Sequence, residues 1–139
     1  MVKAVIDTNV LLISVSKKSP FHWVFQSLLL GRYTLCVSTD ILLEYEEIIG
    51  KEMGFSVADN VMQTLENLPN VELTTKYFYW NLIKEDGDDN KFSDCTIASN
   101  ATCLVSHDAH FNILRKIDFP KVNVVSLEEF KKMLIRKGN

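Results

Sequence analysis

The chain has 139 residues, of which 47% are hydrophobic and 24% are charged, and its formal net charge is −3. This length predicts a single domain over residues 1–139 with one sizeable core. No apolar run approaches the roughly 18 residues that a membrane-spanning helix needs, and the N-terminus lacks the pattern of a secretory signal peptide. We therefore expect no membrane association.

In the first half of the chain, strand-like and helix-like patterns alternate. The predicted elements, in chain order, are a strand over 2–6, helices over 10–15 and 20–31, a strand over 34–37, and helices over 41–49 and 57–68. Pro20 suits the first turn of its helix. Gly31 and Gly50 are expected to end the second and third helices.

The same alternation continues to the end of the chain. The predicted elements are a strand over 71–73, a helix over 88–101, a strand over 102–105, a short helix over 110–115, a strand over 122–125 and a helix over 127–136. Ser126 and Glu129 form a capping-box pattern at the start of the last helix. Residues 78–83 show no clear pattern. Such alternation predicts an α/β fold with a mostly parallel sheet covered on both faces.

Three cysteines, Cys36, Cys95 and Cys103, form an odd set without the spacing of a metal site. Each lies among apolar residues, which predicts buried, reduced thiols and a cytoplasmic setting. A disulfide framework is therefore not expected.

Four acidic residues, Asp7, Glu44, Asp89 and Asp108, occupy positions that solubility does not explain. Asp7 and Asp108 follow the first and fourth predicted strands, so they share one edge of a parallel sheet and meet there if those strands are neighbours. Glu44 lies within an apolar helical pattern, and Asp89 opens a helix. We expect both in first turns at that same edge, where one pocket can collect all four.

Clustered carboxylates repel one another unless a cation is present, and oxygen-rich sites suit Mg²⁺ or Mn²⁺. Such an ion makes a bound water more acidic and stabilises charge on a phosphodiester, which predicts metal-dependent hydrolysis. Each acid also has a simpler interpretation when taken alone. Asp7 suits a helix N-cap, Asp108 suits a turn, and Asp89 with its acidic neighbours suits a solvated helix start. Only their convergence favours the catalytic interpretation.

Other catalytic chemistry has little support in the sequence. No glycine-rich phosphate-binding loop and no recognisable serine or cysteine nucleophile motif is present. The three histidines, His22, His107 and His110, are candidates for acid–base work. His107 and His110 flank Asp108, but we interpret them as surface residues.

Four segments together resemble PIN domains. They are residues 5–11 (VIDTNVL), 38–45 (STDILLEY), 86–92 (DGDDNKF) and 104–108 (LVSHD). They occur in the right order over nearly the whole chain. The likeness is strongest to the bacterial branch of toxin components in toxin–antitoxin systems, similar to VapC ribonucleases.

The resemblance implies a Rossmann-like, three-layer α/β/α fold with a five-stranded parallel sheet and Mg²⁺- or Mn²⁺-dependent ribonuclease activity. It implies that the metal-binding, catalytic acids are Asp7, Glu44, Asp89 and Asp108. Thr8 or Asn9 and Ser106 would orient these carboxylates. Asp94 competes with Asp89 as the third acid; the resemblance favours Asp89 and keeps Asp94 as a possible additional metal ligand.

The implied partners are an RNA substrate, an antitoxin protein and a second copy of the chain in a homodimer. Without the four site acids, 14 acidic residues stand against 15 Lys and Arg residues, which is compatible with a polyanion. Two aromatic segments, 21–25 and 77–80, concentrate apolar surface that core packing or a partner would cover. The alternative functions are a PIN-fold module that binds RNA or a partner without chemistry, and a phosphatase or nucleotide hydrolase.

Overall fold

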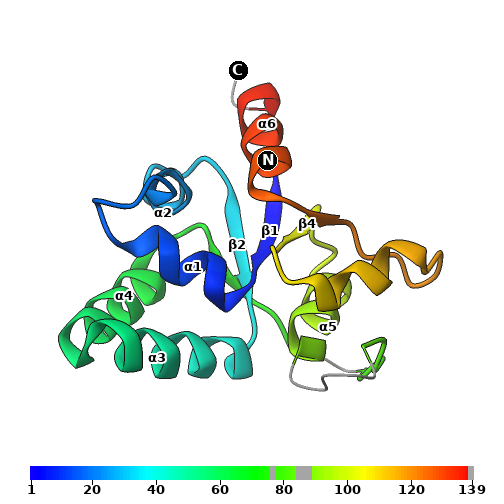
Figure 1. The fold of residues 1–139 in the computed structure, drawn as a ribbon, viewed down its shortest axis with the longest axis horizontal. Coiled ribbons are helices and arrows are strands. Elements are labelled where there is room, and N and C mark those ends of the chain that lie inside the picture. The colour runs from blue at the N-terminus through cyan, green and yellow to red at the C-terminus, as the bar shows by residue number, and fades with distance from the viewer. Residues whose placement is uncertain (76–77, 84–88, 138–139) are drawn as a thin grey trace.

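A five-stranded, all-parallel sheet forms the centre of the protein (Figure 1). The computed structural model describes residues 1–75, 78–83 and 89–137. The strands are β1 (Lys3–Ile6), β2 (Thr34–Val37), β3 (Val71–Leu73), β4 (Cys103–Val105) and β5 (Val124–Val125). Their order across the sheet is β3-β2-β1-β4-β5. The predicted α/β class and parallel sheet are confirmed.

Helices cover both sides of this sheet. They are α1 (Thr8–Val15), α2 (His22–Leu29), α3 (Thr39–Met53), α4 (Phe55–Asn67), α5 (Asn90–Ala98), the 3-10 helix η2 (Ala109–Lys116) and α6 (Leu127–Lys137). In Figure 1, α1 to α4 gather at the left of the sheet, whereas α5 and η2 lie at the right. Among the described residues, none of the helices is long and apolar enough to cross a membrane.

The core explains why the central strands are apolar runs. Ala4, Val5 and Ile6 in β1 are completely buried, as expected for a parallel strand covered on both faces. The three cysteines are also buried, as predicted, and none of them takes part in a disulfide. The hydroxyl of the buried Tyr33 donates to the carbonyl of Val24 at 2.8 Å, so its polar atom is satisfied inside the core.

Several predicted boundaries are wrong, for local reasons. Gly50 does not end α3 but lies inside it, and a Cβ added there would meet Ala58 of α4 at an ordinary contact distance of 3.7 Å. The helix ends instead before Gly54, whose positive φ of 97° suits glycine. Helix α2 begins at His22 rather than at Pro20, which lies in the preceding turn.

The second half of the chain shows smaller differences. Helix α5 is shorter than predicted and β5 has only two residues, whereas the predicted helix over 110–115 is the 3-10 helix η2. Residues 78–83 form no helix or strand. The capping box of α6 is confirmed, because Ser126 and Glu129 exchange bonds between their side chains and backbone amides at 3.1 and 3.0 Å.

The strand order creates the crevice that positions the site. From β1 the chain proceeds to β2 on one side and returns to β4 on the other, so β1 and β4 are neighbours at the point where the order reverses. Ligands of open α/β sheets bind at such a point, beyond the carboxyl ends of the strands. The residues that follow β1 and β4, Asp7 and Ser106, are therefore adjacent.

Candidate metal centre

Asp7 leaves the end of β1 and is buried at the start of α1. It occupies the N-cap position but its side chain makes no capping bond. Its carboxylate instead accepts a hydrogen bond from the Ser106 hydroxyl at 3.0 Å, and its backbone amide donates to Val105 at 3.0 Å. The simple capping interpretation of Asp7 therefore does not describe its side chain.

The position of Asp7 makes its charged form costly. Burial raises the pKa of its carboxyl group from 3.8 to about 6, and the negative charges of Asp89 and Asp108 contribute to this rise, while the bond from Ser106 opposes it. An ionised Asp7 needs a compensating positive charge. A cation beside it would lower this cost.

Asp89 and Asp108 converge with His110 close to this carboxylate. One ligand atom from each of the three lies within 4.8 Å of the others. The Nδ1 atom of His110 is 3.2 Å from Asp89 and 3.5 Å from Asp108. Asp89 lies at the N-cap of α5 and Asp108 at the N-cap of η2, so two helix starts bring these groups together.

Asp108 has two structural partners as well as its neighbours in the cluster. Its side chain accepts from the backbone amide of His110 at 2.9 Å, which caps η2. Its own amide donates to the Ser106 hydroxyl at 2.9 Å. Ser106 thus links the backbone of Asp108 with the side chain of Asp7, and the two acids are held in a fixed relation.

Glu44 lies in the second turn of α3 rather than in the first, and its partners differ from those of the other acids. Its carboxylate accepts from the Thr8 hydroxyl and pairs with the Lys91 ammonium group at 2.8 Å. The side chains of Lys91 and Glu44 are only 16% and 21% exposed. Glu44 is therefore next to the site through Thr8, which follows Asp7, but it already has a fixed cation.

Asp94 is placed differently from Asp89. It is buried one turn further along α5, and its carboxylate accepts from the backbone amide of Trp80 at 3.1 Å. The structure therefore brings Asp89, rather than Asp94, against Asp108 and His110. The acidic neighbours Asp86 and Asp88 lie outside the described residues.

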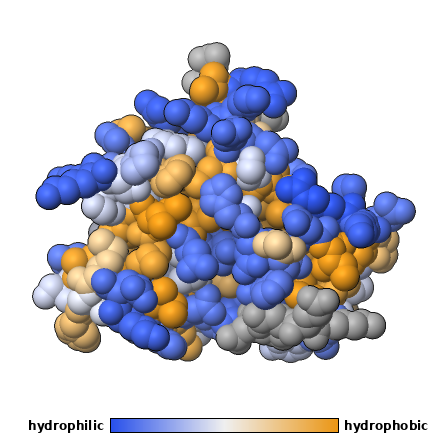
Figure 2. Space-filling model, in the orientation of Figure 1, coloured by the Kyte–Doolittle hydropathy of each residue, from blue (hydrophilic) through white to orange (hydrophobic). Residues whose placement is uncertain are grey.

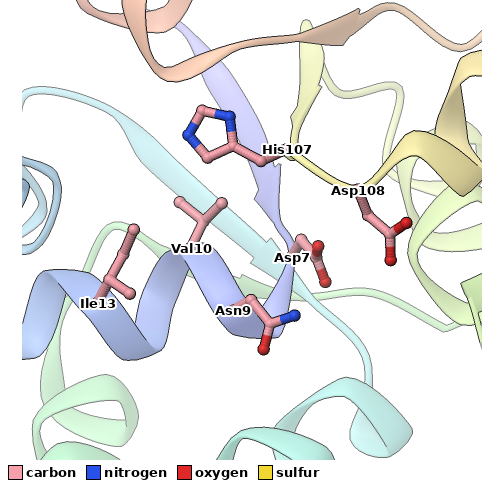
Figure 3. A pocket seen from close by; sticks show the side chains of 6 residues that line it. All are labelled: Asp7, Asn9, Val10, Ile13, His107 and Asp108. Atoms are coloured by element: carbon pink, nitrogen blue, oxygen red, sulfur yellow. The ribbon is translucent and has the colours of Figure 1, made fainter.

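A pocket of about 240 Å³ opens beside these groups (Figure 3). Its lining consists of Asp7, Asn9, Val10, Ile13, His107 and Asp108. In Figure 3 the carboxylates of Asp7 and Asp108 point to the same side, with the Asn9 amide below them. The His107 ring points away from the acids, over Val10. The pocket thus has an acidic end and an apolar end.

The donors fit a hard divalent cation. Carboxylate oxygens are the ligands that Mg²⁺ and Mn²⁺ prefer, and the imidazole nitrogen of His110 favours Mn²⁺ of the two. Asp89, Asp108 and His110 are close enough to share one ion. The raised pKa of the buried Asp7 carboxyl group, caused first by burial and then by the charges of Asp89 and Asp108, agrees with a site where a positive charge would be stabilised.

Two residues of this centre were not recognised from the sequence. We interpreted His110 as a surface residue, and it is exposed, but an Asp-x-His spacing across a helix start also places its ring beside the acids. Lys91 stood inside a motif without a role. Its position two residues after Asp89 is the feature of the sequence that could have indicated a role. Only the packing of α5 against α3 makes Lys91 the partner of Glu44.

The comparisons with known proteins agree with this architecture. The family model described as PIN domain matches residues 3–110. No curated protein sequence matches the chain.

Among solved structures, the fold is similar to that of a chain in VapBC2 from Rickettsia felis. That structure is of VapBC2 bound to a DNA fragment from the promoter of these proteins. The TM-score is 0.62 at 16% identity, over 89% of this chain and 98% of that one. It is also similar to a chain of DNA-bound VapBC from Salmonella typhimurium, with a TM-score of 0.57 at 14% identity over 91% and 99% of the two chains. At these identities the likeness is one of fold. Because the family model covers most of its length, this chain belongs to the PIN-domain family.

Proposed function

We propose that this protein is a divalent-metal-dependent endoribonuclease that hydrolyses phosphodiester bonds in the pocket beside Asp7. The observation that carries the proposal is the convergence of Asp89, Asp108 and His110 next to a buried carboxylate with a raised pKa. Membership of the PIN-domain family supports it, since nucleases are typical of that family. Mg²⁺ or Mn²⁺ is the cofactor that this donor set suits.

In this proposal, Asp89, Asp108 and His110 hold the cation, and Asp7 faces it from the end of β1. When bound, the cation supplies a Lewis acid beside the scissile phosphate. Ser106 keeps the Asp7 carboxylate oriented through its 3.0 Å bond, so the carboxylate needs no rearrangement when a ligand enters. Asn9, whose amide lies in the pocket, can donate to a phosphate oxygen.

Lys91 and Glu44 have a separate task in this proposal. Their ion pair holds a lysine ammonium group next to the site, where Glu44 also accepts from Thr8, without adding a mobile charge. A positive charge that is already fixed beside the pocket stabilises negative charge that develops on a phosphate during reaction. Thr8, whose hydroxyl donates to Glu44, connects this pair with the backbone next to Asp7.

The test is cleavage of a labelled RNA oligonucleotide in Mn²⁺, with Asp7→Asn prepared in the same way as the matched control. Wild type should cleave on the order of 100-fold faster than the variant, and EDTA should abolish the difference. Equal rates would reject the enzymatic proposal. Binding of RNA without any metal affinity in calorimetry would instead favour a PIN-fold binding module without chemistry.

The fold similarity to chains of VapBC complexes supports a biological role as the toxin of a type II toxin–antitoxin pair. On this proposal the protein acts in the cytoplasm as a homodimer, and an antitoxin protein inhibits it. An open reading frame next to its gene whose product binds the protein and blocks cleavage would support the pairing. Light scattering tests the dimer, and a monomer at high concentration would reject it.

A further inference from the structure

Three aromatic side chains form an exposed cluster outside the pocket. Phe78 and Trp80 have ring centroids 6.1 Å apart, and Trp80 meets Phe119 edge to face at 6.3 Å. Phe78 is 72% exposed and Phe119 is 84% exposed, although each could bury well over about 100 Å² in a core. We call Phe78, Trp80 and Phe119 the aromatic surface.

The aromatic surface is connected to the two helices whose N-termini carry the acids, α5 and η2. The amide of Trp80 donates to Asp94 in α5, five residues or about 7.5 Å of helix rise after Asp89. Phe119 follows η2, which begins directly after Asp108. The two elements pack through an edge-to-face contact of Phe92 with Phe111, at 6.2 Å. The acids and the aromatic surface are thus parts of one connected unit.

The surroundings of the aromatic surface suit a polyanion. The segment from 115 to 121, which contains Phe119, has three basic residues and one acidic residue, all exposed: Arg115, Lys116, Lys121 and Asp118. Three basic residues and one acidic residue give this segment a local net charge of +2, whereas the chain as a whole has a net charge of −3. Figure 2 shows hydrophobic side chains at the right of the molecule, in the region where η2 lies in Figure 1, with hydrophilic side chains above them.

We propose that the aromatic surface stacks on unpaired bases of the RNA strand whose backbone lies in the acidic pocket. Stacking on exposed rings beside cations is how proteins bind single strands without reading their sequence. The eight residues of η2 rise about 16 Å, which a stacked strand crosses in about five nucleotides at roughly 3.4 Å each. On this proposal the path from the acids to Phe119 along η2 spans about five nucleotides, and the bases that stack must be unpaired.

A second copy of the chain is a less suitable occupant. Two copies would bring the basic segments over 115–121 together, and like charges would then face each other. RNA can contact both the rings and the basic side chains, because its bases have apolar faces that stack on rings and its phosphates are negatively charged. The proposal rests on the proposed ribonuclease function, but base stacking is measurable without cleavage.

The first experiment uses tryptophan fluorescence in the full-length chain. The sequence has two tryptophans, and Trp23→Phe leaves Trp80 as the single reporter while keeping an aromatic ring against Phe130. In EDTA, a single-stranded RNA about twice the length of that five-nucleotide path should quench Trp80. An abasic ribose-phosphate oligomer of equal length should not quench it. Equal effects of the two oligomers, or no quenching by either, would overturn the proposal.

The second experiment compares two equally exposed phenylalanines by fluorescence anisotropy of the same labelled RNA. Phe119→Ala should weaken binding roughly tenfold, the loss of one stacked base, whereas Phe55→Ala should leave it unchanged. Phe55 is also 84% exposed but lies at the start of α4. Equal affinities of the two variants would overturn the proposal, as would equally tight binding of a duplex of the same sequence.

Two further outcomes separate the competing explanations. If Phe119→Ala converts a dimer into a monomer without affecting RNA affinity, the aromatic surface is an interface between copies and the stacking proposal is wrong. If single-stranded RNA quenches Trp80 while wild type fails to cleave RNA in Mn²⁺, the stacking proposal holds and the ribonuclease proposal fails. Circular dichroism of each variant verifies that its fold is intact.

Discussion

The Ser106 hydroxyl donates a hydrogen bond to the Asp7 carboxylate at 3.0 Å, although 99 positions separate them in the sequence. Pairing of β1 with β4 brings the two strand ends together, and Ser106 also accepts from the amide of Asp108 at 2.9 Å. This bond favours the ionised form of Asp7, against the effect of its burial. Ser106 is thus the residue that opposes the raised pKa most strongly.

Replacing Ser106 should therefore shift the titration of Asp7. In Ser106→Ala, we expect the pKa of the Asp7 carboxyl group to rise above its value of about 6, as measured by NMR titration of metal-free protein. Ser14→Ala is the matched control, since the buried Ser14 hydroxyl donates to Leu11 at 2.7 Å away from the acids. Each variant should lose about 1 kcal/mol of unfolding free energy. A shift in the control variant would contradict this explanation.

Asp7→Asn should stabilise the metal-free protein at high pH while lowering the cleavage rate on the order of 100-fold. The pKa of Asp7 is raised from 3.8 to about 6 in the folded protein, so folding is favoured when Asp7 is protonated. This contribution is fully present below about pH 4 and is lost as the pH rises through about 6. The difference between the folded and unfolded pKa corresponds to about 3 kcal/mol, and the asparagine of the variant has no such pH dependence.

Urea denaturation in EDTA at several pH values measures this effect. The stability advantage of Asp7→Asn over wild type should grow between about pH 4 and pH 8, and Mn²⁺ should then stabilise wild type alone. Asp59→Asn, at an exposed position in α4, should show no such trend. A wild type that gains stability relative to Asp7→Asn as pH rises would have the opposite sign and would reject the burial argument.

Lys91→Met should raise the affinity for Mn²⁺ and lower the rate of RNA cleavage. Loss of the ammonium group leaves Glu44 without its 2.8 Å partner and makes the site more negative, so Mn²⁺ should bind more tightly in calorimetry. Cleavage should fall on the order of tenfold or more, because the fixed positive charge is gone.

Two variants control for other effects of that change. Lys91→Arg keeps the charge and should restore part of the cleavage rate. Lys3→Met removes a more exposed pair with Glu72 at the far end of the sheet and should change neither measurement. Unaltered cleavage by Lys91→Met would assign the ion pair a purely structural role.

His110→Asn should weaken Mn²⁺ binding more than Mg²⁺ binding, because imidazole is a better ligand for Mn²⁺. The expected loss is on the order of tenfold in Mn²⁺ affinity, measured by calorimetry. His107→Asn provides the control, since the ring of His107 points away from the acids. Equal losses for both histidines would show that His110 acts only through general electrostatics.

Asp89→Asn and Asp94→Asn should affect different properties, the first Mn²⁺ affinity and the second stability. Asp89 lies with Asp108 and His110, so its variant should lose Mn²⁺ affinity and keep its stability. Asp94 is buried and accepts from the Trp80 amide; asparagine can still accept there, but it buries an NH₂ donor in place of a carboxylate oxygen, so the variant should lose unfolding free energy of about 1 kcal/mol or more. Loss of Mn²⁺ affinity in Asp94→Asn would make Asp94 a ligand as well, as the sequence interpretation allowed.

Much of the local structure was predictable because it depends on neighbouring residues. The five strands were placed by short apolar runs, and the start of α6 by Ser126 and Glu129, whose capping bonds involve only residues three positions apart. Gly50 shows the limit of this reasoning. A glycine ends a helix only where the backbone turns, and here the backbone turns at Gly54, with a φ of 97°, and not at Gly50.

The sequence by itself determined that acids follow the first and fourth strands, because a strand end and its next residue are local features. It did not determine that β1 and β4 are neighbours, which depends on how the helices pack on both faces. The tertiary structure also paired Lys91 with Glu44, turned His110 toward Asp89 and brought Phe119 to Trp80. Each of these contacts joins elements far apart in the chain, so no local pattern encodes it.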